Sequence, residues 1–449
     1  MKQRLLEIIA RGAPYNAAEL HTVFEDIQTV DIAEVIDELD SAATVRLFRL
    51  LPKNRAANVF AYLSTEQQQV LIEAMTDKEV GTIMNDLFAD DATDIIEEMP
   101  ASIVKRLLRT TDPEKRKAIN NLLLYPEGSA GSVMTVEYIK LKPNDTVAAA
   151  FQKIRATGID KETIYKGFIV DTNRVLIGTV TARALMLADP TQTIGELMDD
   201  NCLTANTLDT SEHVAQLFRR YRLNSLPVTD SEKRLVGIIT VDDVLEIMQE
   251  EATEDIEKMA ALKPLENTYL KTGVFKQAGN RITWLCFLMI SAILTGLVIT
   301  AFETKISTSI VLVTFIPMLM GTGGNAGSQA ATLVIRGMAV GELRARDFGR
   351  IWLKEVRIAI ICGVVLGAIN FLRVFFLGPG RGEALLALTV TISLCVVVII
   401  AKSVGCLLPV IAKKCRLDPA IMAAPLISTI IDTLALLTYF GVATLILGI

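Results

Sequence analysis

The sequence predicts a multidomain membrane protein: an acidic α-helical N domain, a repeated α/β region, a helical connector and an all-α membrane domain of five helices. Three observations support this class. Residues 1–270 carry 29 Lys and Arg against 44 Asp and Glu, whereas residues 271–449 carry 16 against 7. A repeat of 64 residues lies in the acidic part, and five long apolar stretches lie in the basic part. This asymmetry indicates that one half is solvated by water and the other by lipid.

The N domain is expected over residues 1–130. Short stretches of helical periodicity alternate with breaks, and DIAEVIDELD (31–40) resembles DATDIIEEMP (91–100). Similar segments of this kind indicate stacked helical repeats, and therefore a superhelical domain. The N-terminal residues lack the uninterrupted apolar core of a signal peptide, so we expect this half of the chain to stay in the cytosol.

Residues 131–250 contain two copies of one α/β unit, about 134–197 and 198–250. Each copy has apolar runs bounded by polar turn residues, in the order strand–helix–strand–strand–helix. A glycine three residues before a threonine precedes the last helix of each copy, in GTVT and GIIT. The region resembles a tandem pair of CBS domains, a module that usually folds as a disc and often binds adenine nucleotides.

The CBS resemblance implies candidate nucleotide-binding residues. In such domains a Thr or Ser, and an Asp three residues later, commonly hold the ribose. The second copy has this pattern in Thr240 and Asp243, and the first copy offers Thr181 and Arg183. Ala184 stands where the first copy needs its Asp. In the family that the whole chain resembles, nucleotide binding is associated with this first copy. This departure weighs against ATP as a ligand.

A polar connector and five membrane spans are expected in the rest of the chain. Residues 251–281 are polar and mostly helical, and the membrane domain occupies 282–449. Each of its apolar stretches is long enough for a helix to cross a hydrocarbon core of roughly 30 Å. The stretches cover about 282–302, 310–338, 351–377, 384–411 and 419–448.

Basic residues predict the orientation of these spans, because they gather on the cytoplasmic side of membrane proteins. Twelve flank the spans on the side of the connector, and three lie on the opposite side. We therefore expect a multi-pass protein of the cell membrane with its N-terminal domains in the cytoplasm and its C-terminus outside. The twelve are Lys271, Lys276, Arg281, Arg336, Arg344, Arg346, Arg350, Lys354, Arg357, Lys413, Lys414 and Arg416, and the three are Lys305, Arg373 and Arg381.

Asp432 lies in the middle of the last span, within APLISTIIDTLALLTYF. An ionised carboxylate at that depth is costly unless it faces a wet cavity or a cation, so Asp432 is a candidate functional group. The alternatives are a protonated Asp hydrogen-bonded to a neighbouring helix, or one paired with Lys402. Without such a pair, we expect Lys402 to extend along its stem toward the lipid headgroups.

The available ligands favour a hard cation. Six cysteines without a CxxC pair and two distant histidines argue against a transition-metal site and a His-dependent triad. Oxygen donors remain, namely Asp418 at the inner mouth of the last span and Asn325, Ser328 and Gln329 of GTGGNAGSQ. Oxygen ligands suit magnesium or calcium, and magnesium usually keeps several of its waters. No nucleophile and base form a convincing set, so an enzyme is not expected.

Three further segments stand in a fixed order around the CBS-like pair. They are YPEGSAGSVMT (125–135), FIPMLMGTGGNAGSQAATLVIRGMA (315–339) and LDPAIMAAPLISTIIDTLALLTYF (417–440). Together they resemble the hallmark segments of the MgtE-type magnesium transporter family, over essentially the whole chain. The resemblance implies a homodimer in the lipid bilayer, with a pore between the subunits and a cytosolic half that senses intracellular Mg²⁺. No nucleic-acid partner is expected.

The same resemblance assigns roles to individual residues. Asp432 would bind the permeating ion, and Asn325 and Asp418 would help to recognise it. Gln329 is a further candidate pore ligand because of its side-chain oxygen in the second span, and not because of the resemblance. The connector before the first span would be a gating plug helix.

Clustered acids supply a mechanism for sensing in the cytosolic half. Asp91, Asp94 and Glu98 share one helical face by their spacing of three and four residues. Carboxylates that face one another repel unless divalent cations bridge them, so high internal Mg²⁺ would close the pore and low Mg²⁺ would open it. The plain alternative is a solvated acidic surface. The remaining candidate ligands are Asp243, Glu246, Glu250, Glu251, Glu254 and Asp255.

Two other functions compete with this one. The first is a proton- or sodium-coupled carrier of another divalent cation such as Co²⁺ or Mn²⁺. The second is a membrane receptor whose CBS pair senses a nucleotide, although the polar residues of the second and fifth spans argue against spans that only anchor. The sequence has no P-loop of the GxxxxGK[ST] type, which argues against ATP-powered transport.

Overall fold

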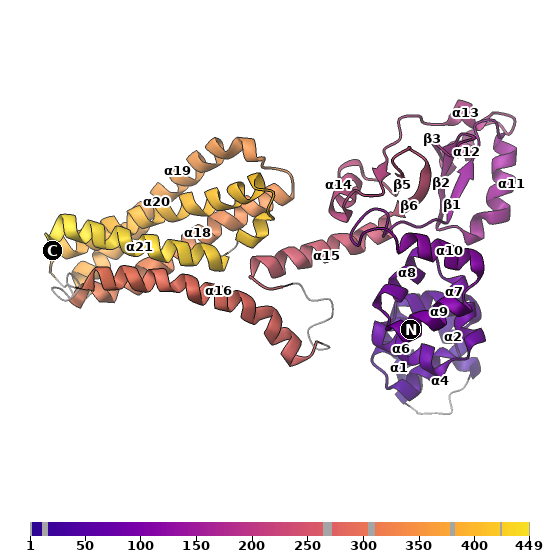
Figure 1. Cartoon of the computed structure of the whole chain (residues 1–449), viewed down its shortest axis with the longest axis horizontal. Helices are drawn as coiled ribbons and strands as arrows, with labels where there is room; N and C mark the ends of the chain where they lie inside the picture. The colour runs from indigo at the N-terminus through magenta and orange to yellow at the C-terminus, as the bar shows by residue number, and fades with distance from the viewer. Residues whose placement is uncertain are drawn as a thin grey trace. The chain divides into compact units, whose positions relative to one another are not determined.

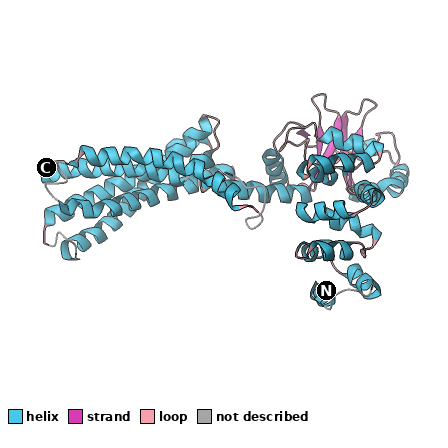
Figure 2. Ribbon diagram, turned by 60° about the horizontal axis from the view of Figure 1, so that its bottom comes forward, coloured by secondary structure: helices cyan, strands magenta, loops and turns pink. Residues whose placement is uncertain are grey.

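A computed structural model of the chain describes residues 2–10, 17–263, 272–303, 310–377, 382–422 and 424–448. The chain divides into two compact units, Met1–Gln249 and Glu250–Ile449. The first unit holds a helical domain and two small sheets, and the second holds long apolar helices (Figure 1 and Figure 2). These elements confirm the predicted fold class.

Short helices build the N domain. Local sequence fixes their ends: at the start of α7, Thr76 accepts a hydrogen bond from the Glu79 amide at 3.3 Å, and Glu79 accepts one from the Thr76 amide at 2.7 Å. This capping box satisfies amides that have no partner within the helix. The described helices are α1 (Lys2–Ala10), α2 (Ala17–Asp26), α3 (Thr29–Asp37), α4 (Ser41–Phe48), α5 (Lys53–Ala61), α6 (Thr65–Ala74), α7 (Asp77–Asp86), α8 (Ala89–Glu98), α9 (Ala101–Thr110) and α10 (Pro113–Leu122).

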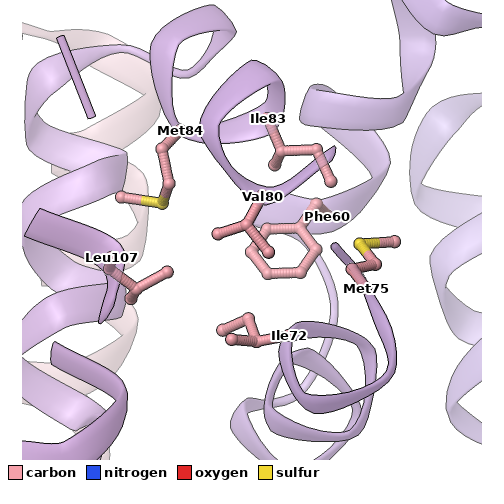
Figure 3. A pocket seen from close by; sticks show the side chains of 7 residues that line it. All are labelled: Phe60, Ile72, Met75, Val80, Ile83, Met84 and Leu107. Atoms are coloured by element: carbon pink, nitrogen blue, oxygen red, sulfur yellow. The ribbon is translucent and has the colours of Figure 1, made fainter. Parts of the chain in front are cut away.

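Apolar side chains from successive helices of the N domain form one continuous core. Figure 3 shows a part of it, where Phe60, Val80 and Leu107 lie around a small gap. The side chains that line this gap are all apolar: Phe60, Ile72, Met75, Val80, Ile83, Met84 and Leu107. It is a packing gap of the core rather than a ligand site.

Two three-stranded sheets with the same topology follow the N domain. In each, the first two strands are parallel and the last two antiparallel. The repeat extends to the helix caps, because Thr146 and Thr210 each accept a hydrogen bond from the third amide of the helix that follows. The first copy contains β1 (Tyr138–Leu141), α11 (Val147–Thr157), β2 (Thr163–Val170), β3 (Leu176–Thr181) and α12 (Ala182–Leu187), and the second, after α13 (Ile194–Leu197), contains β4 (Ala205–Asn206), α14 (Ser211–Tyr221), β5 (Ser225–Thr229), β6 (Leu235–Thr240) and the start of α15 (Val241–Met259).

Helices continue through both ends of the predicted connector. The helix α15 runs without a break from Val241 to Met259, so the boundary predicted at residue 250 falls inside it. Residues 264–271 of the connector lie outside the described residues. The first membrane helix, α16, begins at Val274, eight residues before the predicted start of the first span. Its first turns contain KQAGNR, and such polar residues hide the start of a helix from a reading based on hydropathy.

Among the described residues of the second unit, five helices are long and apolar enough to cross a membrane. In the core that they share, Tyr439 is fully buried and its hydroxyl donates to the Leu312 carbonyl at 2.9 Å. The helix α16 differs from the others, since none of its residues is buried and it packs on α21. The spans are α16 (Val274–Ala301), the short η2 (Ile310–Phe315) with α18 (Ile316–Ala339), α19 (Phe348–Leu377), α20 (Ala384–Lys414) and α21 (Ala424–Leu447), with η4 (Pro419–Met422) before the last.

Candidate functional site

The helix α18 places the glycines and the amides of GTGGNAGSQ on different faces. Gly323, Gly324 and Gly327 are buried, whereas Asn325 and Gln329, one turn apart, are exposed. In the bilayer core an exposed side-chain amide finds no hydrogen-bond partner, since lipid tails offer none and water is absent. The face with Asn325 and Gln329 therefore has to meet water or another protein surface.

The glycine face determines how closely α18 approaches α21. A Cβ atom on Gly323 would lie 2.9 Å from Ile431 Cγ2, and one on Gly324 would lie 3.3 Å from Ser428 Oγ. A larger side chain would push the two helices apart at the level of Asp432, which follows Ile431 in the sequence. The stretch is thus a helix-packing surface on one side and a polar surface on the other.

Asp432 is half-buried on α21. Its neighbour Thr433 lies 3.0 Å from Thr295 of α16, measured between the hydroxyl oxygens. Within the described part of the chain, the Asp432 carboxylate makes neither a hydrogen bond nor an ion pair. Its pairing with Lys402, one of the alternatives that the sequence left open, is therefore not the arrangement in the structure.

Lys402 pairs instead with Glu355 of α19. The Lys402 ammonium lies 3.4 Å from a carboxylate oxygen of Glu355, and the two side chains are only 6% and 9% exposed. The prediction that Lys402 reaches the lipid headgroups was wrong. An ammonium buried between α19 and α20 needs a counter-charge in reach, and Glu355 supplies it.

Sequence reasoning missed Glu355. It stands between Lys354 and Arg357, whose positive charges are typical of a cytoplasmic loop, and α19 begins earlier than predicted, at Phe348. The signal that could have found it is an acid within the predicted span 351–377, which needs a partner of opposite charge.

Asp418, at the inner end of the last span, is joined to the connector helix. One of its carboxylate oxygens accepts from the Ala420 amide at 2.9 Å, and the other lies 2.9 Å from the ammonium of Lys258. The same ammonium lies 2.8 Å from Glu254, one turn earlier on α15. The structure thus brings together a predicted pore residue and a predicted regulatory acid, through a lysine that the sequence did not single out.

A second group of acids gathers in the first unit, between the N domain and the CBS-like pair. We call it the acidic junction. Apolar residues pack beside it, since Ala89 at the start of α8 and Val244 of α15 share one core cluster. The acidic junction consists of Asp90, Asp91 and Asp94 of α8, Glu162 before β2, and Asp242, Asp243 and Glu246 of α15.

Burial and repulsion from neighbouring carboxylates raise the pKa values of five members of the acidic junction, namely Asp90, Asp91, Asp94, Glu162 and Asp243. Loss of hydration, and then the charge of Asp243, raise the pKa of Asp91 to about 6. Loss of hydration and the charge of Asp91 raise the pKa of Asp94 to about 7, although its side chain reaches the surface. The pKa of Glu162 rises to about 8 for the same two reasons, with Asp243 as the strongest neighbouring charge. These carboxylates therefore lack sufficient positive charge around them.

Lys115 supplies part of that positive charge. Its ammonium lies 2.9 Å from Glu137, and its charge lowers the pKa of Asp91. For Asp90, no neighbouring positive charge counters the rise in pKa. Its side chain is only 8% exposed, and its Oδ1 has no hydrogen-bond partner among the described residues. Burial, and then repulsion from Asp243, raise the pKa of Asp90 well above its usual range.

The acidic junction differs in part from the predicted regulatory set. Asp91, Asp94, Asp243 and Glu246 come together as expected, whereas Glu98 accepts a hydrogen bond from the Thr65 hydroxyl within the N domain. Sequence reasoning missed Asp90, Asp242 and Glu162, because it followed one helical face and one helix at a time. Glu250, Glu251 and Asp255 lie on α15 within the second unit.

Among the described residues, no three or more His, Cys, Asp or Glu side chains form a group that could enclose a metal ion. A hydrated Mg²⁺, which keeps several waters, suits carboxylates at a greater distance.

The predicted nucleotide-binding residues have local roles. Asp243 accepts hydrogen bonds from the Thr240 hydroxyl at 2.7 Å and from the Thr240 amide at 3.1 Å. Thr181 caps α12 by accepting from the Ala184 amide at 3.1 Å, and Arg183 is exposed. A cavity of about 130 Å³ lies between the two copies, and these predicted residues are not among those that line it. Its lining includes Lys166, Thr179, Asp199, Cys202 and Ser225.

Family models match most of the chain. The model described as "Divalent cation transporter" matches residues 316–442, and the MgtE intracellular N domain matches 27–128. The CBS domain matches twice, over 130–190 and 194–250.

Relatives of similar length align with nearly the whole chain. "Magnesium transporter MgtE" of Thermus thermophilus is 35% identical over 432 residues, which covers 95% of each protein. The protein of the same name in Bacillus subtilis is 30% identical over 444 residues, or 98% of this chain and 96% of its own. The crystal structure of the cytosolic domain of the Mg²⁺ channel MgtE in complex with ATP aligns with a TM-score of 0.51 and 33% identity, and covers 55% of this chain and all of that one. The chain therefore belongs to the MgtE family of magnesium transporters.

Proposed function

We propose that this chain is a Mg²⁺-selective channel or transporter of the cell membrane, which admits Mg²⁺ to the cell and is closed by Mg²⁺ bound to its cytosolic acids. One observation carries the proposal. Asp432 is an intramembrane carboxylate without a protein counter-charge among the described residues. The other buried charges of the spans, Lys402 of α20 and Glu355 of α19, neutralise each other. A permeating cation is the group that completes such a site.

The chemistry of the polar groups supports Mg²⁺ as the cargo. The exposed amides of Asn325 and Gln329 on α18 and the Asp432 carboxylate on α21 can bind a cation only through their oxygen atoms. One carboxylate with neutral oxygens suits a cation that keeps its waters, as Mg²⁺ does. The names of the relatives from Thermus and Bacillus support the same cargo, and Co²⁺ and Mn²⁺ are the alternative cargoes.

A pore between two subunits would give the polar face of α18 a partner other than lipid. Asn325 and Gln329 are exposed in the single chain, and exposed amides are costly in hydrocarbon. A second copy that presents the same face would enclose these amides around water, and the two Asp432 residues would lie near a common axis. The proposed assembly is therefore a homodimer. From the distribution of basic residues, we further propose that its C-terminus lies outside the cell.

An inside-negative membrane potential would drive uptake without another energy source. A divalent cation gains about 4.6 kcal/mol for each 100 mV, which is twice the value for a single charge. Such a gradient needs a gate, since an open pore would fill the cell with the ion.

The acidic junction is the proposed sensor of internal Mg²⁺. Its carboxylates on α8, before β2 and on α15 lack neutralising charge, as the raised pKa values of Asp91, Asp94 and Glu162 indicate. Mg²⁺ between them would remove the repulsion and hold the N domain against the CBS pair. Loss of Mg²⁺ would let the surfaces separate, and α15 continues from these acids into the connector.

ATP is a second ligand favoured by one observation. The cavity of about 130 Å³ between the CBS copies has Lys166 in its lining, and an ammonium can pair with a phosphate. The cytosolic domain with ATP mentioned above is a relative of this unit. Because Ala184 replaces the expected Asp, we expect ATP to bind this chain more weakly than a CBS pair that keeps the Asp. Titration of the full-length protein with ATP, alone and after Lys166→Met, tests this point.

Flux through proteoliposomes tests the main proposal. The purified full-length protein should admit Mg²⁺ down an imposed gradient, and Asp432→Asn should lower the rate at least tenfold. Glu383→Gln is the matched control, because Glu383 is an exposed acid at the start of α20 and should not contribute to conduction. Unchanged flux in Asp432→Asn would reject the pore assignment. Absence of Mg²⁺ flux in the wild type would favour a Co²⁺ or Mn²⁺ carrier or, if these ions also fail to cross, the nucleotide-sensing receptor.

A further inference from the structure

Lys258 joins the last turn of α15 to the inner end of the pore domain. Its ammonium lies 2.9 Å from Asp418 and 2.8 Å from Glu254, so a single positive charge sits between two carboxylates. Asp418 is 160 residues away in the sequence, whereas Glu254 is one turn away on the same helix. The contact is therefore both a tertiary link and a local helix pair.

The residue that follows Lys258 strengthens this docking. Met259 packs against the apolar cluster that contains Ala331 of α18, Ala401 of α20 and Ile431 of α21. A charged contact and an apolar contact at successive positions hold the end of α15 against the helices that carry Asn325 and Asp432. An isolated surface ion pair contributes little to stability by itself. The adjacent apolar contact of Met259 therefore distinguishes this docking from an incidental surface pair.

Both carboxylate oxygens of Asp418 are occupied in this arrangement. Oδ1 accepts from the Ala420 amide, and Oδ2 faces the Lys258 ammonium. An incoming cation would meet a fixed positive charge at the residue expected to recognise it, and like charges at this distance repel.

We propose that Lys258 is a tethered cation that occupies the ion position of Asp418 in the closed state, and that it has to leave before Mg²⁺ can pass. This inference rests on the proposed function, since it assumes a pore that internal Mg²⁺ closes. It adds an ammonium as the blocking group, where the sequence suggested only a plug helix and acids.

Glu254 has a different part in the same device. Because it lies on α15, it moves together with Lys258 when the helix withdraws from Asp418. The ammonium then keeps one carboxylate partner, so opening does not leave an unpaired charge in a partly buried place. Glu254 thus keeps the Lys258 ammonium paired on α15, and it is not a ligand of regulatory Mg²⁺.

Flux at two internal Mg²⁺ concentrations tests the proposal. Lys258→Met keeps the length and apolar stem of the side chain and removes its charge. It should leave flux at low internal Mg²⁺ unchanged and raise the residual flux at high internal Mg²⁺ several-fold. Lys258→Arg should close as the wild type does. Lys263→Met is the matched control, because Lys263 is exposed shortly after the same helix.

The outcomes separate this inference from the proposed function. If the wild type conducts and is closed by internal Mg²⁺ while Lys258→Met closes equally well, the tethered cation is wrong and the proposed function stands. If internal Mg²⁺ does not close the wild type, the proposed gating and the tethered cation are both wrong.

A labelling experiment on the wild type avoids any effect of substitution on folding. Amine acetylation of the full-length protein, read by mass spectrometry, should modify Lys258 several-fold more slowly at high Mg²⁺ than after chelation. Lys263 should react equally in both conditions. Equal labelling of Lys258 with and without Mg²⁺ would overturn the proposal.

Discussion

Lys402 of α20 and Glu355 of α19 form an ion pair inside the membrane domain, with 3.4 Å between the ammonium and a carboxylate oxygen. Removal of one partner leaves the other charge buried without compensation, which costs about 3–5 kcal/mol in such pairs. We therefore expect Lys402→Met alone, or Glu355→Leu alone, to lower the midpoint of thermal unfolding of the purified protein by several degrees.

The double variant Lys402→Met/Glu355→Leu is the control for this pair. Replacement of both charges by apolar groups of similar size is often neutral or stabilising. The double variant should therefore recover most of the loss of either single variant. Additive losses in the double variant would show that the two side chains act through other contacts.

Neutralisation of the acidic junction should weaken inhibition by internal Mg²⁺. Asp91→Asn or Asp243→Asn removes a charge that bridging Mg²⁺ would use, so the internal Mg²⁺ concentration for half-closure should rise about tenfold, or about 1.4 kcal/mol. Flux measured against internal Mg²⁺ concentration gives this value. Glu98→Gln, on the same helix but bonded to Thr65, should leave it unchanged. Equal shifts in Asp91→Asn and Glu98→Gln would argue for a diffuse surface effect.

The raised pKa values of the acidic junction predict a pH dependence with a definite sign. A carboxyl group whose pKa is higher in the folded state stabilises the fold below its usual pKa, and this contribution is lost as pH rises through the folded-state value. The usual value for Asp is 3.8, and the folded values are about 6 for Asp91 and about 7 for Asp94, while Glu162 moves from 4.5 to about 8.

Without Mg²⁺, the thermal stability of the protein should therefore fall as pH rises from about 4 to about 8. Saturating Mg²⁺ should flatten this dependence, because it replaces protons as the neutralising charge. Mg²⁺ should also bind more tightly at pH 8 than at pH 6, with release of protons that calorimetry in buffers of different ionisation enthalpy detects. A stability that rises with pH in the absence of Mg²⁺ would contradict this account.

Local patterns were sufficient to predict the fold class of the regions that hold these sites. Hydropathy over about 20 residues finds the spans, and the repeat shows in strand order and turn residues, so the fold class followed from the sequence alone. The start of α16 at Val274 was missed, because its polar first turns carry no signal of lipid contact.

Partners distant in the sequence could not be predicted in the same way. Glu355 lies 47 residues from Lys402, and Asp418 lies 160 residues from Lys258. Charge alone indicates that each lysine needs a partner, but helix packing selects which acid it meets. The same limit explains why Glu162, in a loop before β2, was not grouped with the acids of α8.

The close contact of α18 with its neighbours gives a last prediction. A Cβ atom on Gly327 would meet the end of the Ile431 side chain and would also lie 3.0 Å from the Ala401 carbonyl oxygen, whereas one on Gly405 of α20 would meet the Gly327 carbonyl at a shorter distance than that. A side-chain end can shift to relieve a clash, but a backbone carbonyl in a helix cannot. Gly405→Ala should therefore destabilise the protein more than Gly327→Ala, within the range of about 1–3 kcal/mol for overpacking.

Shortening Ile431 distinguishes the two cases. Ile431→Val should restore part of the thermal stability that Gly327→Ala loses, because it removes the atom nearest to the new methyl group, while the Ala401 carbonyl oxygen stays 3.0 Å away. It should not restore Gly405→Ala. Gly441→Ala is the control, since a Cβ atom there meets nothing within 4 Å, and alanine favours a helix by about 1 kcal/mol. If Ile431→Val rescued both variants equally, the backbone contact between α18 and α20 would not be what limits their approach.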